Sequence, residues 1–135
     1  MRRLLLCLSI VTATITAPVG PASACSCILL TPKEKAKRAD VVFTGRVLRI
    51  GEPSDGLVVA RFGVRVLFKG MVTRRVNVTT ASDEAACGCR FRVGRRYTVF
   101  AYHPDGEGLT TDLCSGTRRG RIDHDRYGLP RGTPP

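Results

Sequence analysis

The sequence is poor in the residues on which most catalytic sites depend. It contains only two histidines, His103 and His124, and nothing in the chain fixes either of them near a cysteine that would act as a nucleophile. A Cys-His catalytic pair is therefore not supported. We predict that the protein is not an enzyme and that it carries no cofactor.

The chain also lacks a second long hydrophobic run. Its single run, Leu4–Ile15, is too short to cross the roughly 30 Å of hydrocarbon in a bilayer. Two arginines precede it, and Ala22-Ser23-Ala24 supplies the small residues that signal peptidase requires. We predict that residues 1–24 are a secretory signal peptide, and that the product is secreted to the extracellular space without a stable membrane anchor.

Cleavage after Ala24 would make Cys25 the first residue of the mature chain. The alternative is a lipoprotein, because a cysteine after Ser23-Ala24 partly resembles a lipid-attachment motif. Against that alternative, Ala22 stands where leucine is usual, and the stretch APVGP separates the cysteine from the hydrophobic run.

Acidic residues are few. The full chain has 11 of them against 22 basic residues, and 18 of the basic residues are arginine. The basic residues are spread along the chain, which indicates first that they cover a solvated surface of the protein. Binding to a polyanionic surface stays an open alternative. We predict no nucleic-acid partner, because a secreted protein would rarely meet one.

Five cysteines remain after cleavage, namely Cys25, Cys27, Cys87, Cys89 and Cys114. In an exported domain of about 110 residues they indicate disulfides more than metal ligands. A four-thiolate zinc site made from the two Cys-x-Cys pairs is the rival. Zinc ligands are usually spaced by two to four residues, and an oxidising compartment works against free thiolates. We therefore predict no metal of its own and one odd thiol.

Most of the remaining chain has a β-strand pattern. The stretch TPKEKAKR begins with a capping box, Thr31 with Glu34 three residues later, and predicts a helix of about two turns. Five strand-like runs follow: DVVFTGRVLRI, ARFGVRVLFKG, RRVNVTT, RYTVFAY and GLTTDL. In the second run we expect Phe62, Val64, Val66 and Phe68 to share one face.

Five short strands in about 75 residues predict a mainly β protein. We expect a five-stranded OB-fold-like Greek-key barrel with a short N-terminal helix, and a flattened sandwich is the alternative. We place this domain at residues 25–117. Residues 118–135, rich in arginine, glycine and proline, are predicted to be a basic, partly disordered tail.

Several stretches in order resemble one known family. They are CSCILLTPKEKAKRADVVFTGRV, VRVLFKG, DEAACG and GLTTDLC, with Asp40 fifteen residues after the first cysteine. They resemble the N-terminal netrin-like domain of the tissue inhibitors of metalloproteinases, which has an OB fold and begins its mature chain with Cys-x-Cys. The resemblance covers roughly residues 25–117, and the second domain of that family is absent.

The resemblance implies how the cysteines pair. It implies the disulfides Cys25–Cys87 and Cys27–Cys114, which would staple an N-terminal strand to the barrel. Cys89 has no counterpart and becomes the odd thiol, with pairing to Cys25 in place of Cys87 as the alternative. We expect the Cys89 thiol to be alkylatable or to join two otherwise monomeric chains, and a tyrosine at this position to be tolerated. Lys37 stands where the family has a further half-cystine.

The resemblance also implies a function. The α-amine and carbonyl of a mature Cys25 would chelate the catalytic zinc of a secreted zinc metalloprotease, and Ser26 would point into the specificity pocket beside the metal. The other residues expected to contact the protease are Cys27, Ile28, Asp83, Glu84, Ala85 and Ala86. The alternative is a secreted netrin-like module that binds another protein without inhibiting a protease.

Overall fold

The computed structural model describes residues 24–106 and 108–135. The predicted signal peptide, apart from Ala24, lies outside the described residues. Within the described part, no helix has the length and apolar character needed to cross a membrane.

The protein is mainly β, with one short α-helix. The strands are β1 (Val41–Ile50), β2 (Leu57–Lys69), β3 (Arg75–Ala81), β4 (Arg96–Ala101), β5 (Leu109–Thr110) and β6 (Arg118–Arg119). The helices are α1 (Pro32–Arg38) and two 3-10 turns, η1 (Glu84–Ala86) and η2 (Asp125–Tyr127). Each of the five predicted runs contains a strand, whereas β6 was not predicted.

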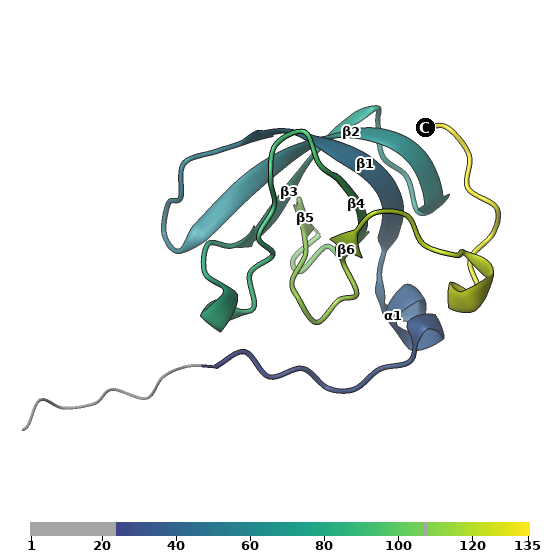
Figure 1. Ribbon diagram of the computed structural model, residues 1–135, viewed down its shortest axis with the longest axis horizontal. Helices are drawn as coiled ribbons and strands as arrows, with labels where there is room; N and C mark the ends of the chain where they lie inside the picture. The colour runs from purple at the N-terminus through teal and green to yellow at the C-terminus, as the bar shows by residue number, and fades with distance from the viewer. Residues whose placement is uncertain (1–23, 107) are drawn as a thin grey trace, which may run out of the picture.

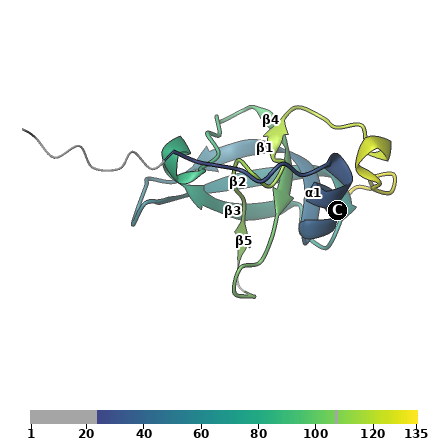
Figure 2. The same ribbon diagram turned by 90° about the horizontal axis from the view of Figure 1, so that it is seen from below.

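The strands form one curled mixed sheet with the order β5-β3-β2-β1-β4-β6 (Figure 1). All neighbouring strands are antiparallel except β3 and β5, which are parallel. A single bridge between Tyr102 and Thr110 also joins the end of β4 to β5. Because β5 contacts strands at both sides of the curl, the sheet forms a half-barrel (Figure 2).

The concave side of the sheet holds the larger core. Phe62 lies at its centre and makes edge-to-face contacts with Phe43, Phe91 and Tyr97, at centroid distances of 5.5, 5.1 and 6.5 Å. Such aromatic pairs add about 0.5–1.5 kcal/mol each beyond the burial of their area. A smaller core lies on the other side of β1 and β4, where α1 and the C-terminal segment pack on Val42 and Phe100.

A β-bulge changes which face β2 presents along its length. Gly45 pairs with Val64, but the preceding residue Thr44 pairs with Val66, so β2 contains one extra residue at Arg65. The prediction that Phe62, Val64, Val66 and Phe68 share one face is therefore wrong. Phe62 and Val64 face the larger core, whereas Phe68 packs against the smaller one. A bulge shifts the two-residue alternation by one position.

The helix α1 begins as the sequence predicts. The Thr31 hydroxyl accepts a hydrogen bond from the Glu34 amide at 3.3 Å, and a Glu34 carboxylate oxygen accepts one from the Thr31 amide at 2.7 Å. These two bonds satisfy amides that the first turn of a helix leaves unpaired. The capping box fixes where the extended N-terminal segment ends and the helix begins.

Residues 118–135 do not form the partly disordered tail that we predicted from their composition. Strand β6 pairs with β4, and Thr133 exchanges two backbone hydrogen bonds with Leu67 of β2, at 2.7 and 2.9 Å. Between these points Tyr127 and Leu129 are buried against α1 and Phe100. Two large apolar side chains stabilise an otherwise polar segment, and they make it part of the domain.

Candidate functional site

Two disulfides hold the N-terminal segment against the sheet. Cys25 is bonded to Cys87 and Cys27 to Cys114, with Cα–Cα distances of 4.9 and 5.2 Å. These are the two pairs that the family resemblance implies. Figure 1 shows the segment as an extended stretch that runs along one side of the sheet from the region of η1 to α1. The two cross-links fix its backbone at both ends of the sequence Cys-Ser-Cys.

The loop that carries Cys87 is shaped by its own sequence. The Asp83 carboxylate accepts a hydrogen bond from the Ala85 amide at 2.9 Å and so caps the turn η1. Cys87 closes this turn in the left-handed conformation, with φ 63°. Gly88 follows because a Cβ at its position would lie 2.0 Å from the Ala81 carbonyl oxygen. The acidic-small-small-Cys-Gly pattern therefore determines the conformation of this loop.

The loop that carries Cys114 depends on Asp112, a residue that the sequence analysis did not single out. The Asp112 carboxylate accepts hydrogen bonds from the amides of Cys114 and Ser115, at 2.8 and 2.7 Å. Its other oxygen accepts one from the Tyr102 hydroxyl at 2.9 Å. The signal that would have found it is the Asp-x-Cys-Ser spacing, because aspartate typically bonds the amides two and three residues ahead.

A backbone hydrogen bond connects the two loops directly. The amide of Leu113 donates to the carbonyl of Cys87 at 2.9 Å. The two disulfides consequently lie side by side, with the Cys114 sulfur 3.9 Å from that of Cys25 and 4.0 Å from that of Cys87.

This arrangement bears on the alternative of a four-thiolate zinc site. The sulfurs of Cys25, Cys27 and Cys114 all lie within 4.8 Å of one another, which is close enough for metal ligands. All three are paired in disulfides, however, and a disulfide sulfur is not the thiolate that zinc requires. Cys89, which that site would need, is buried in the larger core instead.

The residues expected to contact a protease are on the surface. Ser26, Cys27 and Ile28 are exposed on the N-terminal segment, and so are residues 83–86 of the η1 loop. The disulfide from Cys25 to Cys87 brings these two stretches together. We call the combination of residues 25–29 and 83–86 the N-terminal ridge.

Leu29 belongs to this ridge although it was not predicted. Its side chain is 98 % exposed, and that of its neighbour Ile28 is 73 % exposed. Two adjacent large apolar side chains in water are typical of a surface that contacts a partner. Beside them lies a cavity of about 290 Å³, which is lined by Ser26, Cys27, Ile28, Leu30, Arg38, Asp112, Cys114 and Ser115.

The odd thiol does not have the chemistry that we expected from the sequence. Cys89 is only 7 % exposed, and its amide donates to the Thr80 hydroxyl at 2.9 Å. Burial, with the nearby charge of Asp112, raises the pKa of its thiol to about 12. Thiolate is the reactive form. The expectations of ready alkylation and of a dimer linked through Cys89 are therefore not supported.

The two histidines lie apart from this thiol. The His103 ring nitrogen Nδ1 is 2.7 Å from the Gly108 carbonyl oxygen, and His124 lies beside Asp125 with Nδ1 3.1 Å from its carboxylate. Neither histidine lines the cavities that border Cys89. The structure does not bring together the residues of a Cys-His pair.

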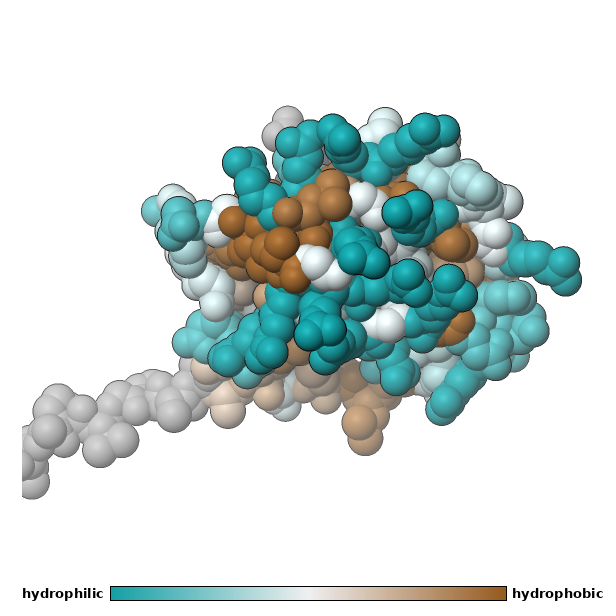
Figure 3. Space-filling model, turned by 45° about the horizontal axis from the view of Figure 1, so that its top comes forward, coloured by the Kyte–Doolittle hydropathy of each residue, from teal (hydrophilic) through white to brown (hydrophobic). Residues whose placement is uncertain are grey.

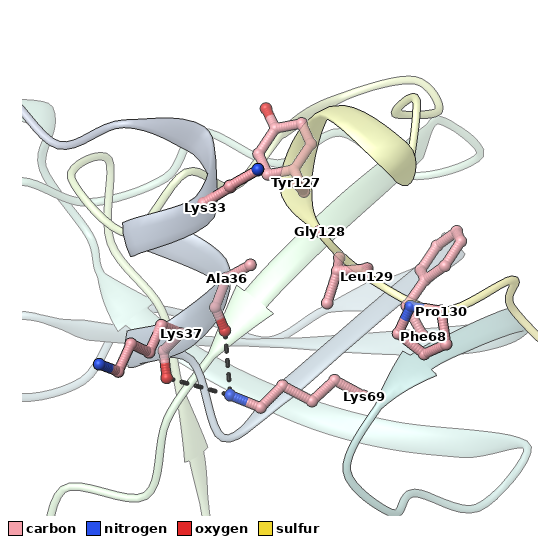
Figure 4. A pocket seen from close by; sticks show the side chains of 9 residues that line it. All are labelled: Lys33, Ala36, Lys37, Phe68, Lys69, Tyr127, Gly128, Leu129 and Pro130. Atoms are coloured by element: carbon pink, nitrogen blue, oxygen red, sulfur yellow. Dashed lines mark hydrogen bonds between the residues drawn. The ribbon is translucent and has the colours of Figure 1, made fainter.

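A cavity of about 400 Å³ lies between α1, the end of β2 and the C-terminal segment (Figure 4). Lys69 crosses it, and its amino group donates to the carbonyls of Ala36, Lys37 and Ala39 at the end of α1. Carbonyls at a helix C-terminus have no partner within the helix, and a lysine suits their partial negative charge. Lys69 therefore links α1 to the sheet.

The chain matches no protein-family model, and no curated protein sequence matches it either.

Proposed function

We propose that this chain is a secreted inhibitor of zinc metalloendopeptidases, and that it acts through the first residue of its mature form, Cys25. The observation that supports the proposal best is the N-terminal ridge. Cys25 and Cys27 are each bonded to a different loop of the sheet, while Ser26 between them is exposed. A backbone held in this way has already lost the conformational freedom that binding would otherwise cost, about 1–2 kcal/mol per residue.

The proposed chemistry needs only the main chain of Cys25. A catalytic zinc site has three protein ligands and one water molecule that becomes the nucleophile. The free α-amino nitrogen of Cys25 and the carbonyl oxygen of the same residue form a five-membered chelate with such a zinc. The chelate displaces the water, and the protease loses its nucleophile.

Neighbouring residues would determine which protease is bound. Ser26 is the first side chain after the chelating residue, and it would enter the pocket beside the zinc. The apolar side chains of Ile28 and Leu29 would bury their exposed surface on the protease, at roughly 25 cal/mol per Å² of apolar area. Residues 83–86 would widen the contact on the other side of the disulfide.

We further propose that the curled sheet is an OB-type barrel of the netrin-like kind. Two features support this: the short β5 pairs in parallel with β3, and the bridge from Tyr102 to Thr110 joins β5 to the end of β4. Five strands then follow one another around the barrel, and β6 is an addition at the edge of β4. The helix α1 lies between the disulfide-bonded N-terminal segment and the first strand.

The second candidate function is protein binding without inhibition. The exposed pair Ile28 and Leu29 favours it as much as it favours inhibition, because apolar contact does not require a metal in the partner. The two functions differ in whether the α-amine of Cys25 takes part.

The experiment compares the mature protein with a form that carries one extra alanine before Cys25. Both are assayed against several secreted zinc endopeptidases, and the control is a form with one extra alanine after Pro135. The extension before Cys25 removes the donor amine and places an additional residue at the metal. We expect inhibition by the mature protein and the control, and at least a hundredfold weaker inhibition by the N-terminally extended form.

The pH dependence gives a second readout. An ordinary α-amine has a pKa of about 7.7–8.0, and only its neutral form binds a metal. Inhibition should weaken up to about tenfold for each pH unit below this range. Equal potency of the mature and N-terminally extended forms, or no inhibition by either, would reject the chelation mechanism and favour the binding module.

A further inference from the structure

Arginines from three strands line up across the convex side of the sheet. Arg96 of β4 pairs with Arg46 of β1, Arg46 pairs with Gly63 of β2, and Gly63 pairs with Arg75 of β3. Directly paired residues project to the same face of a sheet. Arg46, Arg75 and Arg96 are all exposed. We call these three residues the arginine row.

The row is unfavourable for the sheet by itself. Arg46 and Arg96 are direct cross-strand neighbours, about 4.5–5.5 Å apart at their Cα atoms, and like charges at such positions are destabilising. A second like-charged pair, Arg49 with Arg61, lies farther along β1 and β2. A surface that places like charges together twice is suited to an external partner of opposite charge.

The described part of the chain does not supply that opposite charge. Within residues 24–106 and 108–135, Arg90 is the one arginine with a carboxylate oxygen within 4.0 Å, that of Glu84 at 3.4 Å. The arginine row therefore has no acidic partner in the described part of the protein.

The row borders a cavity that can accept a ligand. Its volume is about 400 Å³, and its lining includes Arg46, Arg65, Arg74 and Arg75, together with Leu48, Gly63, Val64, Pro134 and Pro135. Gly63 has no side chain of its own, and the branched end of Leu48 lies over it, with Cγ and both Cδ atoms 3.4–3.6 Å from where a Cβ would be. Arg46 and Arg75 both line this cavity, so one ligand bound there can contact both side chains.

We propose that this face binds a linear acidic polysaccharide, one that carries sulfate or carboxylate groups. Guanidinium groups bind both groups with paired hydrogen bonds, and a row that extends over several strands suits a repeating anion. Single-stranded nucleic acid fits less well, because it requires exposed aromatic side chains for its bases. The exposed large hydrophobic residues of the described chain include no aromatic one.

The face is separate from the N-terminal ridge. In Figure 1 β1 and β2 lie at the top of the molecule, and the N-terminal segment runs along the bottom. Figure 3 turns the top forward and shows hydrophilic side chains around a hydrophobic patch. No residue lines both this cavity and the one beside Ser26. Polysaccharide and protease would therefore bind without excluding each other.

The test measures binding of the full secreted chain to immobilised heparin, which is sulfated, and to polygalacturonate, which carries only carboxylates. The variant is Arg46→Gln/Arg75→Gln. Its matched control, Arg121→Gln/Arg126→Gln, loses the same charge at exposed positions of the C-terminal segment. We expect about tenfold weaker binding of the row variant at 0.15 M salt, and less than twofold for the control. Retention on heparin alone identifies sulfate as the group that the protein binds. Retention on both polysaccharides shows that carboxylate groups are sufficient for binding.

Thermal unfolding checks that the row variant is folded. Because removing Arg46 relieves the repulsion from Arg96, the melting temperature of the variant without ligand should be equal to or above that of the unmodified protein. Heparin should raise the melting temperature of the unmodified protein at low salt and raise that of the row variant less. Equal loss of binding in both double variants would overturn the proposal. So would tighter binding to single-stranded DNA or to phosphatidylglycerol vesicles than to either polysaccharide.

Discussion

At the scale of single residues, Gly88 and Cys89 show how differently two neighbours can be constrained. Gly88 is required by space, since any Cβ would overlap the Ala81 carbonyl oxygen. Cys89 is required by packing, since its small side chain fills a position in the larger core. The stretch DEAACG contains Gly88, and Cys89 was expected only as the odd thiol. Neither reason can be read from the sequence, because the contact with Ala81 depends on how the loop folds back onto β3.

Replacement of Gly88 by alanine should lower the free energy of unfolding by at least about 2 kcal/mol, because the loop must move to accept the methyl group. The matched control is Gly51→Ala, whose new Cβ would make an ordinary 3.5 Å contact with the Val59 carbonyl oxygen. We expect the control to change stability by less than about 1 kcal/mol. Urea denaturation of both variants measures the difference, and similar values for the two would contradict the steric reason.

The raised pKa of Cys89 predicts a stability that falls in alkaline solution. Well below pH 9 the thiol is neutral in both the folded and the unfolded chain, so its titration has no effect on stability. Between pH 9 and about 12 the unfolded chain releases the proton first, and stability should fall by up to about 1.4 kcal/mol per pH unit. Cys89→Ala should remove this part of the decline in denaturation curves measured across that range. A variant with an unchanged alkaline decline would show that other groups cause it.

The same burial corrects our expectation about tyrosine at position 89. A ring in place of a buried thiol overpacks the core, which typically costs about 1–3 kcal/mol. Cys89 therefore tolerates a smaller residue better than a larger one.

At the scale of elements, the sequence was sufficient to predict those helices and strands that depend on residues close together in the chain. The capping box of α1 and the five strand-like runs depend on neighbouring residues, and the structure contains all of them. The bulge at Arg65 and the strand β6 depend on pairing between distant segments. No local pattern in the sequence of β2 indicates that Arg65 is the residue without a partner in β1.

The C-terminal segment gives a prediction at this scale. Tyr127 is buried against Phe100, with ring centroids 5.2 Å apart. Tyr127→Ala should destabilise the domain by about 3 kcal/mol, because it leaves a cavity between α1 and β4. The control is Arg126→Ala, an exposed neighbour in the same turn, which should change stability by less than about 0.5 kcal/mol. Thermal unfolding of both variants provides the measurement. A segment that was disordered in solution would leave the two variants alike.

At the scale of the whole molecule, the disulfides close loops that contain most of the domain. Cys25 and Cys87 are 62 residues apart, and Cys27 and Cys114 are 87 apart. No spacing rule selects this pairing from five cysteines. The resemblance to a known family supplied it, whereas the anchoring role of Asp112 became visible only once the loops were seen together.

Removal of the longer cross-link by Cys27→Ser/Cys114→Ser should therefore cost about 2–4 kcal/mol of stability, because the unfolded chain regains its freedom. The double substitution avoids a new free thiol. Denaturant midpoints of this variant and of the unmodified protein measure the cost. A variant that keeps its stability but frees the N-terminal segment, detected by faster proteolysis before Thr31, would show that the bond serves the ridge and not the fold.

The bridge between Thr133 and Leu67 has a consequence for how copies of the protein meet. β2 continues past Gly63, the last residue of β2 that pairs with β3, so the amide and carbonyl of Leu67 face outward on that side. Unpaired strand edges recruit strands from other chains and lead to aggregation. The last residues of the chain occupy this edge, and they include Pro134 and Pro135, which have no amide hydrogen to offer a further strand. Residues 133–135 thus cover the part of the β2 edge at which the sheets of two molecules could otherwise pair.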